Sequence, residues 1–230
     1  MKLSNNLIPI ISKNEFDDVA ENFLETHFPQ ALKAPIAIPI EEIAIHSLKL
    51  QIKKVHLSED LSILGQIFFS RGLAEVYLKD TDEFVYEPVE KGMMFVDPDV
   101  ATEQNIGRER NTIAHECVHW CIHRSYHTVQ IIAGGEKAVA FRCPIEPPSE
   151  KVQSKWSDID WMEWQANGIA PKILMPKNTF LKYIEEHPIY TKMKSKSQSI
   201  FQDLLIDEIA DFFQVSKQSA SIRLMELDVI

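Results

Sequence analysis

The stretch "NTIAHECVHW", residues 111–120, places two histidines four residues apart, with a glutamate directly after the first. In a helix, positions i and i+4 lie on one face, so the imidazoles of His115 and His119 can bind the same cation. Glu116 points about 100° away around the helix axis, which makes it a poor third ligand but lets it reach a water molecule on the open side of the metal. This is the HExxH pattern of two zinc ligands and a general base. It predicts a Zn²⁺ site at His115 and His119, with Glu116 as the catalytic base.

The residues around this pattern favour a metal site over a chance coincidence. The segment "TIAHECVHWCI" surrounds the two histidines and the glutamate mainly with apolar side chains. Burying such polar groups is costly unless something binds them, and zinc favours imidazole nitrogen. Zinc also lowers the pKa of a bound water toward ~7, and a neighbouring carboxylate can take its proton and later pass it to a leaving amine. The pattern therefore indicates zinc-dependent hydrolysis.

A hydrolytic zinc site needs three protein ligands and one open position, so the third ligand must come from elsewhere in the chain. His123 lies eight residues after His115. Eight residues span about 12 Å of helix, and one ion with bonds near ~2 Å cannot bridge that distance. We expect His123 either to be exposed or to support another ligand from behind. The third histidine of the metzincin pattern is also absent, because Ser125 occupies its position.

Glu163, in the segment "WMEWQANGIA", is the candidate that we favour for the third ligand. Asn167 follows one helical turn later on the same face, where its amide could hold a ring nitrogen of a ligand histidine. Asp158 and Asp160 remain alternatives, although acidic residues in the first turn of a helix also serve as caps.

Composition and charge limit the other functions open to the chain. The 230 residues are 45% hydrophobic and carry a formal net charge of −10, which disfavours nonspecific binding of nucleic acid. We find neither an apolar run of the ~18 residues that a membrane span needs nor a secretory signal at the N-terminus. The odd number of cysteines (Cys117, Cys121 and Cys143) indicates reduced thiols, and no CxxC pattern supports a soft-metal site. We therefore expect a cytoplasmic protein without membrane association.

The periodicity of the chain predicts an α+β fold. Helical spacing covers about residues 14–28, 40–48 and 103–124, and a further helix begins near residue 157. The segments "LQIKKVHL", "ILGQIFFS" and "GLAEVYL" are typical of antiparallel strands, and "GMMFVDP" predicts another strand before the HExxH helix. The segment "TVQIIAGGEKAVAFRCP" indicates a hairpin that turns at Gly134-Gly135. Helices that bracket a small sheet define the fold class.

The end of the chain, "IFQDLLIDEIADFFQVSKQSASIRLMEL", predicts two helices joined at Gln214-Val215, with Ser216 as the N-cap of the second. This unit is helix-turn-helix-like. Its first helix carries acidic residues that would repel phosphate, so we expect a packing or partner-docking unit and no direct DNA binding. These acidic residues are Asp203, Asp207, Glu208 and Asp211. We predict a zinc metallopeptidase domain at residues 1–190 and a C-terminal helical unit at residues 191–230 packed on it.

Two of the segments above carry a family resemblance. "TIAHECVH" followed by "EWQANGIAPKILMP" resembles the ImmA/IrrE family of zinc metallo-endopeptidases, and the tail "IADFFQVSKQSASIRLMEL" is similar to the usual end of its members. The resemblance covers most of the chain from about Pro39 onward. It implies zinc ligands His115, His119 and Glu163, with Glu116 as catalytic base. It also implies a gluzincin-like zinc core of helices against a small, mostly antiparallel sheet.

The resemblance also implies a partner, because the family is associated with cleaving or otherwise inactivating helix-turn-helix repressors of mobile elements and stress genes. We therefore expect a zinc-dependent endopeptidase that acts on a cytoplasmic regulator of this kind. The alternative is a non-catalytic repressor-binding or antitoxin-like module that keeps the zincin scaffold. A pure binding module does not need Glu116, which this chain retains.

The chain departs from the family pattern in three places. Asn111 stands where the family has phenylalanine, and Pro171 follows Ile169-Ala170 after the second motif. The two motifs are also further apart than usual, and the extra length is the stretch 125–155. This stretch either forms a flap over the cleft that helps to select the substrate, or it is a passive surface hairpin.

Overall fold

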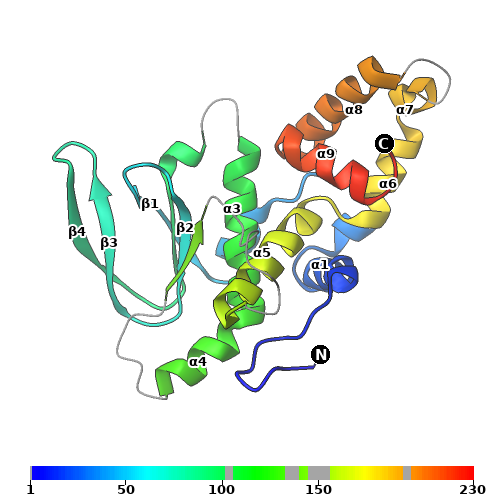
Figure 1. Cartoon of the computed structure of the whole chain (residues 1–230). Helices are drawn as coiled ribbons and strands as arrows, with labels where there is room; N and C mark the ends of the chain where they lie inside the picture. Colours follow the sequence, from blue (N-terminus) through cyan, green and yellow to red (C-terminus); the bar gives the residue numbers. More distant parts are fainter. Residues whose placement is uncertain (1, 102–105, 133–139, 145–155, 194–197) are drawn as a thin grey trace.

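The computed structural model describes residues 2–101, 106–132, 140–144, 156–193 and 198–230, with the backbone alone for 140–144, 191–193 and 198–200. Helices pack beside two small β-sheets, which confirms the predicted α+β fold. Figure 1 shows the helix that carries the HExxH pattern in the middle of the molecule, between the strands and a second group of helices. None of the helices in the described part of the chain is long and apolar enough to cross a membrane.

The predicted helices are found close to their expected positions. The first group is α1 (Phe16–His27), α2 (Ile40–Glu42) with the π-helical turn η3 (Ile43–Ser47), α3 (Ile106–Val118) with the π-helical turn η5 (His119–His123), and α4 (Arg124–Ile132). The second group is α5 (Asp158–Leu174), α6 (Lys177–Glu186), α7 (Pro188–Met193), α8 (Gln198–Phe213) and α9 (Lys217–Glu226). Short 3₁₀ turns are η1 (Lys13–Glu15), η2 (Pro29–Leu32) and η4 (Pro98–Val100).

The HExxH helix is longer than its sequence pattern indicated. α3, η5 and α4 follow one another without a break, so the predicted end at Arg124 is wrong. The predicted hairpin is also wrong in its first arm, because residues 128–132 are helical. Its turn at Gly134-Gly135 lies outside the described residues. The extra turns are held by His127, which is buried and stacks on Phe69 with 4.2 Å between the ring centroids.

The larger sheet has four strands in the order β1-β5-β2-β6, namely β1 (Gln51–Lys54), β5 (Met93–Val96), β2 (Ile63–Phe68) and β6 (Ala140–Pro144). β2 pairs antiparallel with both β5 and β6. β1 and β5 are parallel, however, so the expectation that β1 is antiparallel is wrong. The reason is that β5 lies between β1 and β2, whereas neighbouring strands in the sequence would pair directly in a simple meander.

A separate two-stranded sheet is formed by β3 (Gly72–Leu78) and β4 (Glu83–Val89). β4 was not anticipated, because its sequence "EFVYEPV" contains two glutamates and a proline among the apolar residues. One face of this hairpin packs against the larger sheet, because Ala74 and Val76 share a small hydrophobic core with Phe68 of β2 and Phe95 of β5. The hairpin therefore lies beside the main sheet and packs on it (Figure 1).

The larger sheet lies directly against α3. A Cβ atom placed on Gly65 in β2 would lie 2.6 Å from Cγ2 of Thr112 and 3.1 Å from Oε1 of Glu116. Only a glycine allows β2 to come this close, because any larger residue would push the strand away from the helix. On its other side α3 packs against α5, which in turn packs against α1. This sandwich brings the two sequence motifs face to face.

The C-terminal helices share the main hydrophobic core with the rest of the chain, through buried residues such as Leu205, Ile209 and Phe213. The predicted junction of α8 and α9 is confirmed: Gln214 has a left-handed backbone with φ 54°, and the Ser216 side chain accepts a hydrogen bond from the Ser219 N–H. This junction contacts the first turn of α3, since a Cβ on Gly107 would lie 2.2 Å from the Ser216 nitrogen. The C-terminal unit thus packs on the HExxH helix, and its boundary at residue 191 stays a prediction.

Arg223 in α9 ties three distant parts of the chain together. Its side chain is only 2% exposed, its Nε donates a hydrogen bond to the Met175 carbonyl, and its guanidinium pairs with both carboxylate oxygens of Asp17 in α1. A planar guanidinium and a carboxylate form a bidentate pair of this kind with a defined geometry. A buried charge of this type is tolerated only while its partner is present.

We predict that Asp17→Asn lowers the free energy of unfolding by about 2 kcal/mol, because the buried Arg223 guanidinium loses its bidentate carboxylate and keeps only the Glu226 carboxylate, 3.6 Å away, as a counter-charge. Denaturant unfolding followed by circular dichroism measures this change. Asp18→Asn, on the exposed side of the same helix, is the matched control and should change stability by less than about 0.5 kcal/mol. Equal effects of the two substitutions would contradict this role of the ion pair.

Candidate metal centre

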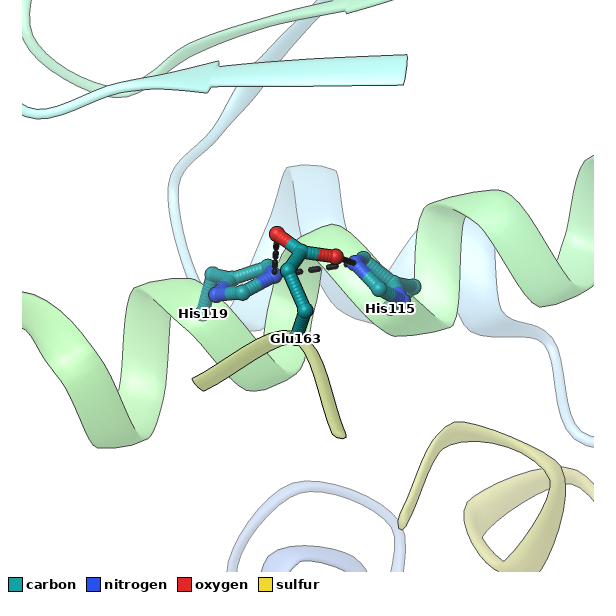
Figure 2. Close-up of side chains that lie close together, drawn as sticks. All are labelled: His115, His119 and Glu163. Carbon is teal, nitrogen blue, oxygen red and sulfur yellow. Dashed lines mark hydrogen bonds and ion pairs between the residues drawn. The ribbon is translucent and has the colours of Figure 1, made fainter. Parts of the chain in front are cut away.

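Three side chains from two helices converge at the centre of the molecule. His115 lies near the end of α3, His119 begins the π-helical turn that follows, and Glu163 comes from the second turn of α5. All three are buried, and one donor atom from each lies within 4.8 Å of the others. Figure 2 shows the Glu163 carboxylate lying against the two imidazole rings. The structure therefore brings together the three residues that the sequence put forward as metal ligands.

The distances within this group suit a single cation. An ion held tetrahedrally by bonds of about 2.1 Å keeps its ligand atoms roughly 3.4 Å apart. The Glu163 oxygens lie 3.3 Å from His115 Nε2 and 3.4 Å from His119 Nε2, and the two Nε2 atoms are 2.9 Å apart. Both carboxylate oxygens are buried, and neither makes a hydrogen bond to another described residue. A divalent cation would satisfy these oxygens, so the residues fit a metal ion.

The ionisation of the group also favours cation binding. Burial alone would raise the pKa of Glu163, but its contacts with His115 and His119 outweigh burial and lower the pKa to about 2. Burial lowers the pKa of His119 to about 4. The glutamate is therefore a carboxylate and His119 a neutral imidazole at neutral pH, which are the forms that bind a metal.

Glu116 has the opposite environment from Glu163, although both are buried glutamates. It is fully buried under β2, and this burial, with the negative charge of Glu163, raises its pKa well above the usual value. The backbone of Ile67 offsets this rise only in part, and within the described part of the chain neither oxygen has a full hydrogen bond. A raised pKa brings a carboxyl group closer to the range in which it can take up and release a proton near neutral pH.

The structure places His123 behind His119. It is fully buried, its Nδ1 lies 2.9 Å from His119 Nδ1, and its Nε2 lies 2.9 Å from Gln165 Oε1. Of the two expectations for His123, exposure is wrong, and its contact with His119 agrees with support from behind of a candidate ligand. Gln165 was missed by the sequence reasoning; the only available signal was an amide two residues after Glu163 in a largely apolar helix.

The role expected for Asn167 is wrong. Its Nδ2 and the Nδ1 of His115 are both buried, and neither has a hydrogen bond in the part of the chain that the structure describes. Asp158 and Asp160 lie outside the group and serve other purposes. Asp160 forms a capping box with Ser157 at the start of α5, and Asp158 accepts a hydrogen bond from Asn6 at 2.6 Å.

The other groups that could bind a metal are less suitable. His56, Asp97 and Asp99 have donor atoms close together, but the Leu57 and Asp99 N–H groups hydrogen-bond to Asp97 at 2.9 and 3.0 Å, and Lys79 pairs with Asp99. These contacts stabilise both carboxylates without a metal ion. Cys117 and Cys121 are free thiols, and neither belongs to a metal-binding group among the described residues.

We predict that His115→Ala and Glu163→Ala each weaken metal binding by at least ~100-fold, because each leaves only two of three ligands in place. Zinc content after dialysis against a limiting chelator, measured by mass spectrometry, tests this. Asp160→Ala is the control on the same helix as Glu163 and should keep full zinc content. A Glu163→Ala protein that retains zinc as well as the unmodified chain would rule out the third ligand.

We predict that the metal-free protein loses stability as the pH falls from about 6.5 to about 4. In this range the unfolded chain protonates His119, with its ordinary pKa of 6.5, whereas the folded chain does not, with its pKa of about 4. The unfolded state then binds more protons, so acid favours it by up to about 1.4 kcal/mol per pH unit for one histidine. Denaturant titrations at several pH values should show a smaller loss for His119→Gln and an unchanged loss for the exposed His46→Gln. An equal loss of stability in His119→Gln and in the unmodified chain would contradict a buried neutral imidazole at His119.

Comparison with known families agrees with this site. The family model Peptidase_M78, described as the IrrE N-terminal-like domain, matches residues 74–225, a range that contains His115, Glu116, His119 and Glu163. This range covers well over half of the chain and confirms the ImmA/IrrE resemblance. No curated protein matches the chain. The chain therefore belongs to the Peptidase_M78 family of metallopeptidase-like, IrrE N-terminal-like domains.

Proposed function

We propose that this protein is a zinc-dependent endopeptidase that cleaves a cytoplasmic regulator. The observation that carries the proposal is the convergence of two imidazoles and a carboxylate on one point, next to a second glutamate that takes no part in the group. An N₂O donor set of this kind is typical of catalytic zinc sites. Membership of the Peptidase_M78 family supports a peptidase over other zinc hydrolases.

The chain's own residues divide the work of hydrolysis between them. His115, His119 and Glu163 would hold the ion. When bound, zinc would polarise the scissile carbonyl and lower the pKa of a water molecule. Glu116 would take a proton from that water and pass it to the leaving amine, which restores the carboxylate. The two glutamates suit different roles because contacts with histidines lower the pKa of Glu163, while burial raises that of Glu116.

We propose a helix-turn-helix transcriptional repressor as the substrate. The ImmA/IrrE resemblance supports this choice, and so does charge, because the formal net charge of −10 complements the basic surface that binds DNA in such a repressor. The charge of the C-terminal unit argues against direct DNA binding by the chain itself. Lys217, at the start of the helix that would face DNA, is paired with Asp207 of the preceding helix at 2.8 Å.

We predict that Glu116→Gln keeps its zinc but lowers the rate of cleavage by about 10²–10⁴-fold, because the amide cannot accept the proton of the attacking water. The measurement incubates the purified protein with repressors encoded beside it and follows the fragments by mass spectrometry. Glu109→Gln, in the same helix as Glu116 but paired with Lys54, is the matched control and should cleave normally.

The same variant separates the proposal from its alternative, a non-catalytic repressor-binding module. A module of this kind would act by binding alone, so Glu116→Gln would inactivate the repressor as well as the unmodified chain does. That result, together with intact repressor in the mass spectrum, would replace the endopeptidase with the binding module.

A further inference from the structure

A chain of hydrogen bonds leads from His119 to the N-terminal segment. His119 Nδ1 lies 2.9 Å from His123 Nδ1, and His123 Nε2 lies 2.9 Å from Gln165 Oε1. Gln165 Nε2 then donates a hydrogen bond to the backbone carbonyl of Pro9 at 2.7 Å. His119, His123 and Gln165 are all buried. The series thus joins the π-helical turn of the motif helix, α5 and a segment that precedes α1.

The Pro9 carbonyl sets the direction of the first bonds. A carbonyl oxygen can only accept, so the atom of Gln165 that faces it must be the NH₂ group. The other end of the same amide is then the oxygen, which can only accept from His123. A flipped amide would instead place two oxygens 2.7 Å apart, which is repulsive. His123 therefore carries a proton on Nε2.

The direction continues through His123 to His119. A cationic His123 would be a buried charge directly beside the His119 imidazole, an arrangement that is costly and more so when His119 binds a divalent cation. In a neutral imidazole one nitrogen carries the proton and the other accepts, so Nδ1 of His123 accepts from Nδ1–H of His119. His119 is then left with a lone pair on Nε2, the atom that lies beside His115 and Glu163.

We propose that Pro9, Gln165 and His123 act as positioning residues that fix the tautomer and ring orientation of His119 for metal binding. This inference rests on the proposed role of His119 as a ligand. It extends the metal centre to the N-terminal segment, because Pro9 lies outside residues 74–225, the range of the family match. Only one of the two motif histidines is held in this way, since Nδ1 of His115 has no hydrogen bond among the described residues. His119 is thus the histidine with a fixed tautomer.

The matched variants His123→Leu and His123→Asn test this role. Leucine removes the acceptor for His119 Nδ1–H, and we expect metal affinity to fall by about 10–100-fold, as for other residues that orient a ligand histidine. The asparagine oxygen can take the place of His123 Nδ1 as the acceptor. His123→Asn should therefore keep the support of His119 and bind zinc within about threefold of the unmodified chain. Competition with a chromophoric chelator measures both affinities. Equal affinities of the leucine variant and the unmodified chain would overturn the proposal.

A second measurement needs no substitution and no metal. Nitrogen-15 NMR of the histidine rings in the unmodified, metal-free protein should show His119 protonated on Nδ1 and His123 protonated on Nε2. The opposite tautomer at either residue would overturn the proposal, even if His123→Leu fails to fold. Because this measurement does not depend on metal, it tests the positioning role of His123 separately from the proposed zinc-dependent function. Failure of the chain to bind zinc would remove the proposed function, whereas the tautomers test the hydrogen-bond series itself.

Discussion

The structure depends on the burial of five ionisable side chains where α3 and its extension meet α5. His115, Glu116, His119 and His123 come from the first helix and Glu163 from the second, and none is more than 5% exposed. Removing such groups from water is costly, and the cost is recovered only where each group finds a partner or a cation. Glu163 contacts the imidazoles of His115 and His119. His119 contacts His123, which in turn contacts Gln165. The unsatisfied oxygens that remain are those where the proposed metal and water would bind.

The surrounding elements pack closely against the motif helix and hold it in place beside α5. Gly65 allows β2 to approach the motif helix, and the junction of α8 and α9 packs against Gly107 at the start of the same helix. The π-helical turn begins at His119, in keeping with the tendency of such turns to occur at functional sites. The helix is therefore supported along its length, while His115 and His119 face Glu163 of α5. Rigid elements of this kind hold a catalytic group more accurately than loops do.

The pattern of the chain indicated most of the helices and strands, but it did not indicate how they pair. The strand segments near residues 51, 63, 72 and 93 were found, yet the parallel pairing of β1 with β5 depends on where β5 inserts, which no local pattern records. β4 was missed because Pro88 and two glutamates obscure its alternation, although its pairing with β3 is regular. Residues 128–132 have apolar character that suits either a strand or a helix. They are helical in the structure, where the packing of His127 on Phe69 stabilises the helix.

What the sequence determined by itself is the part of the site that local geometry controls. Residues i and i+4 share a helix face wherever the helix lies, so the pairing of His115 with His119 and the sideways position of Glu116 follow from spacing alone. Only the tertiary structure could bring Glu163 to the two imidazoles, place Gln165 rather than Asn167 in contact with a histidine, and bring the Pro9 carbonyl to Gln165 across 156 positions of the chain. The reason is that contacts between distant segments depend on how helices pack, and a rotation of α5 by part of a turn would have presented different side chains.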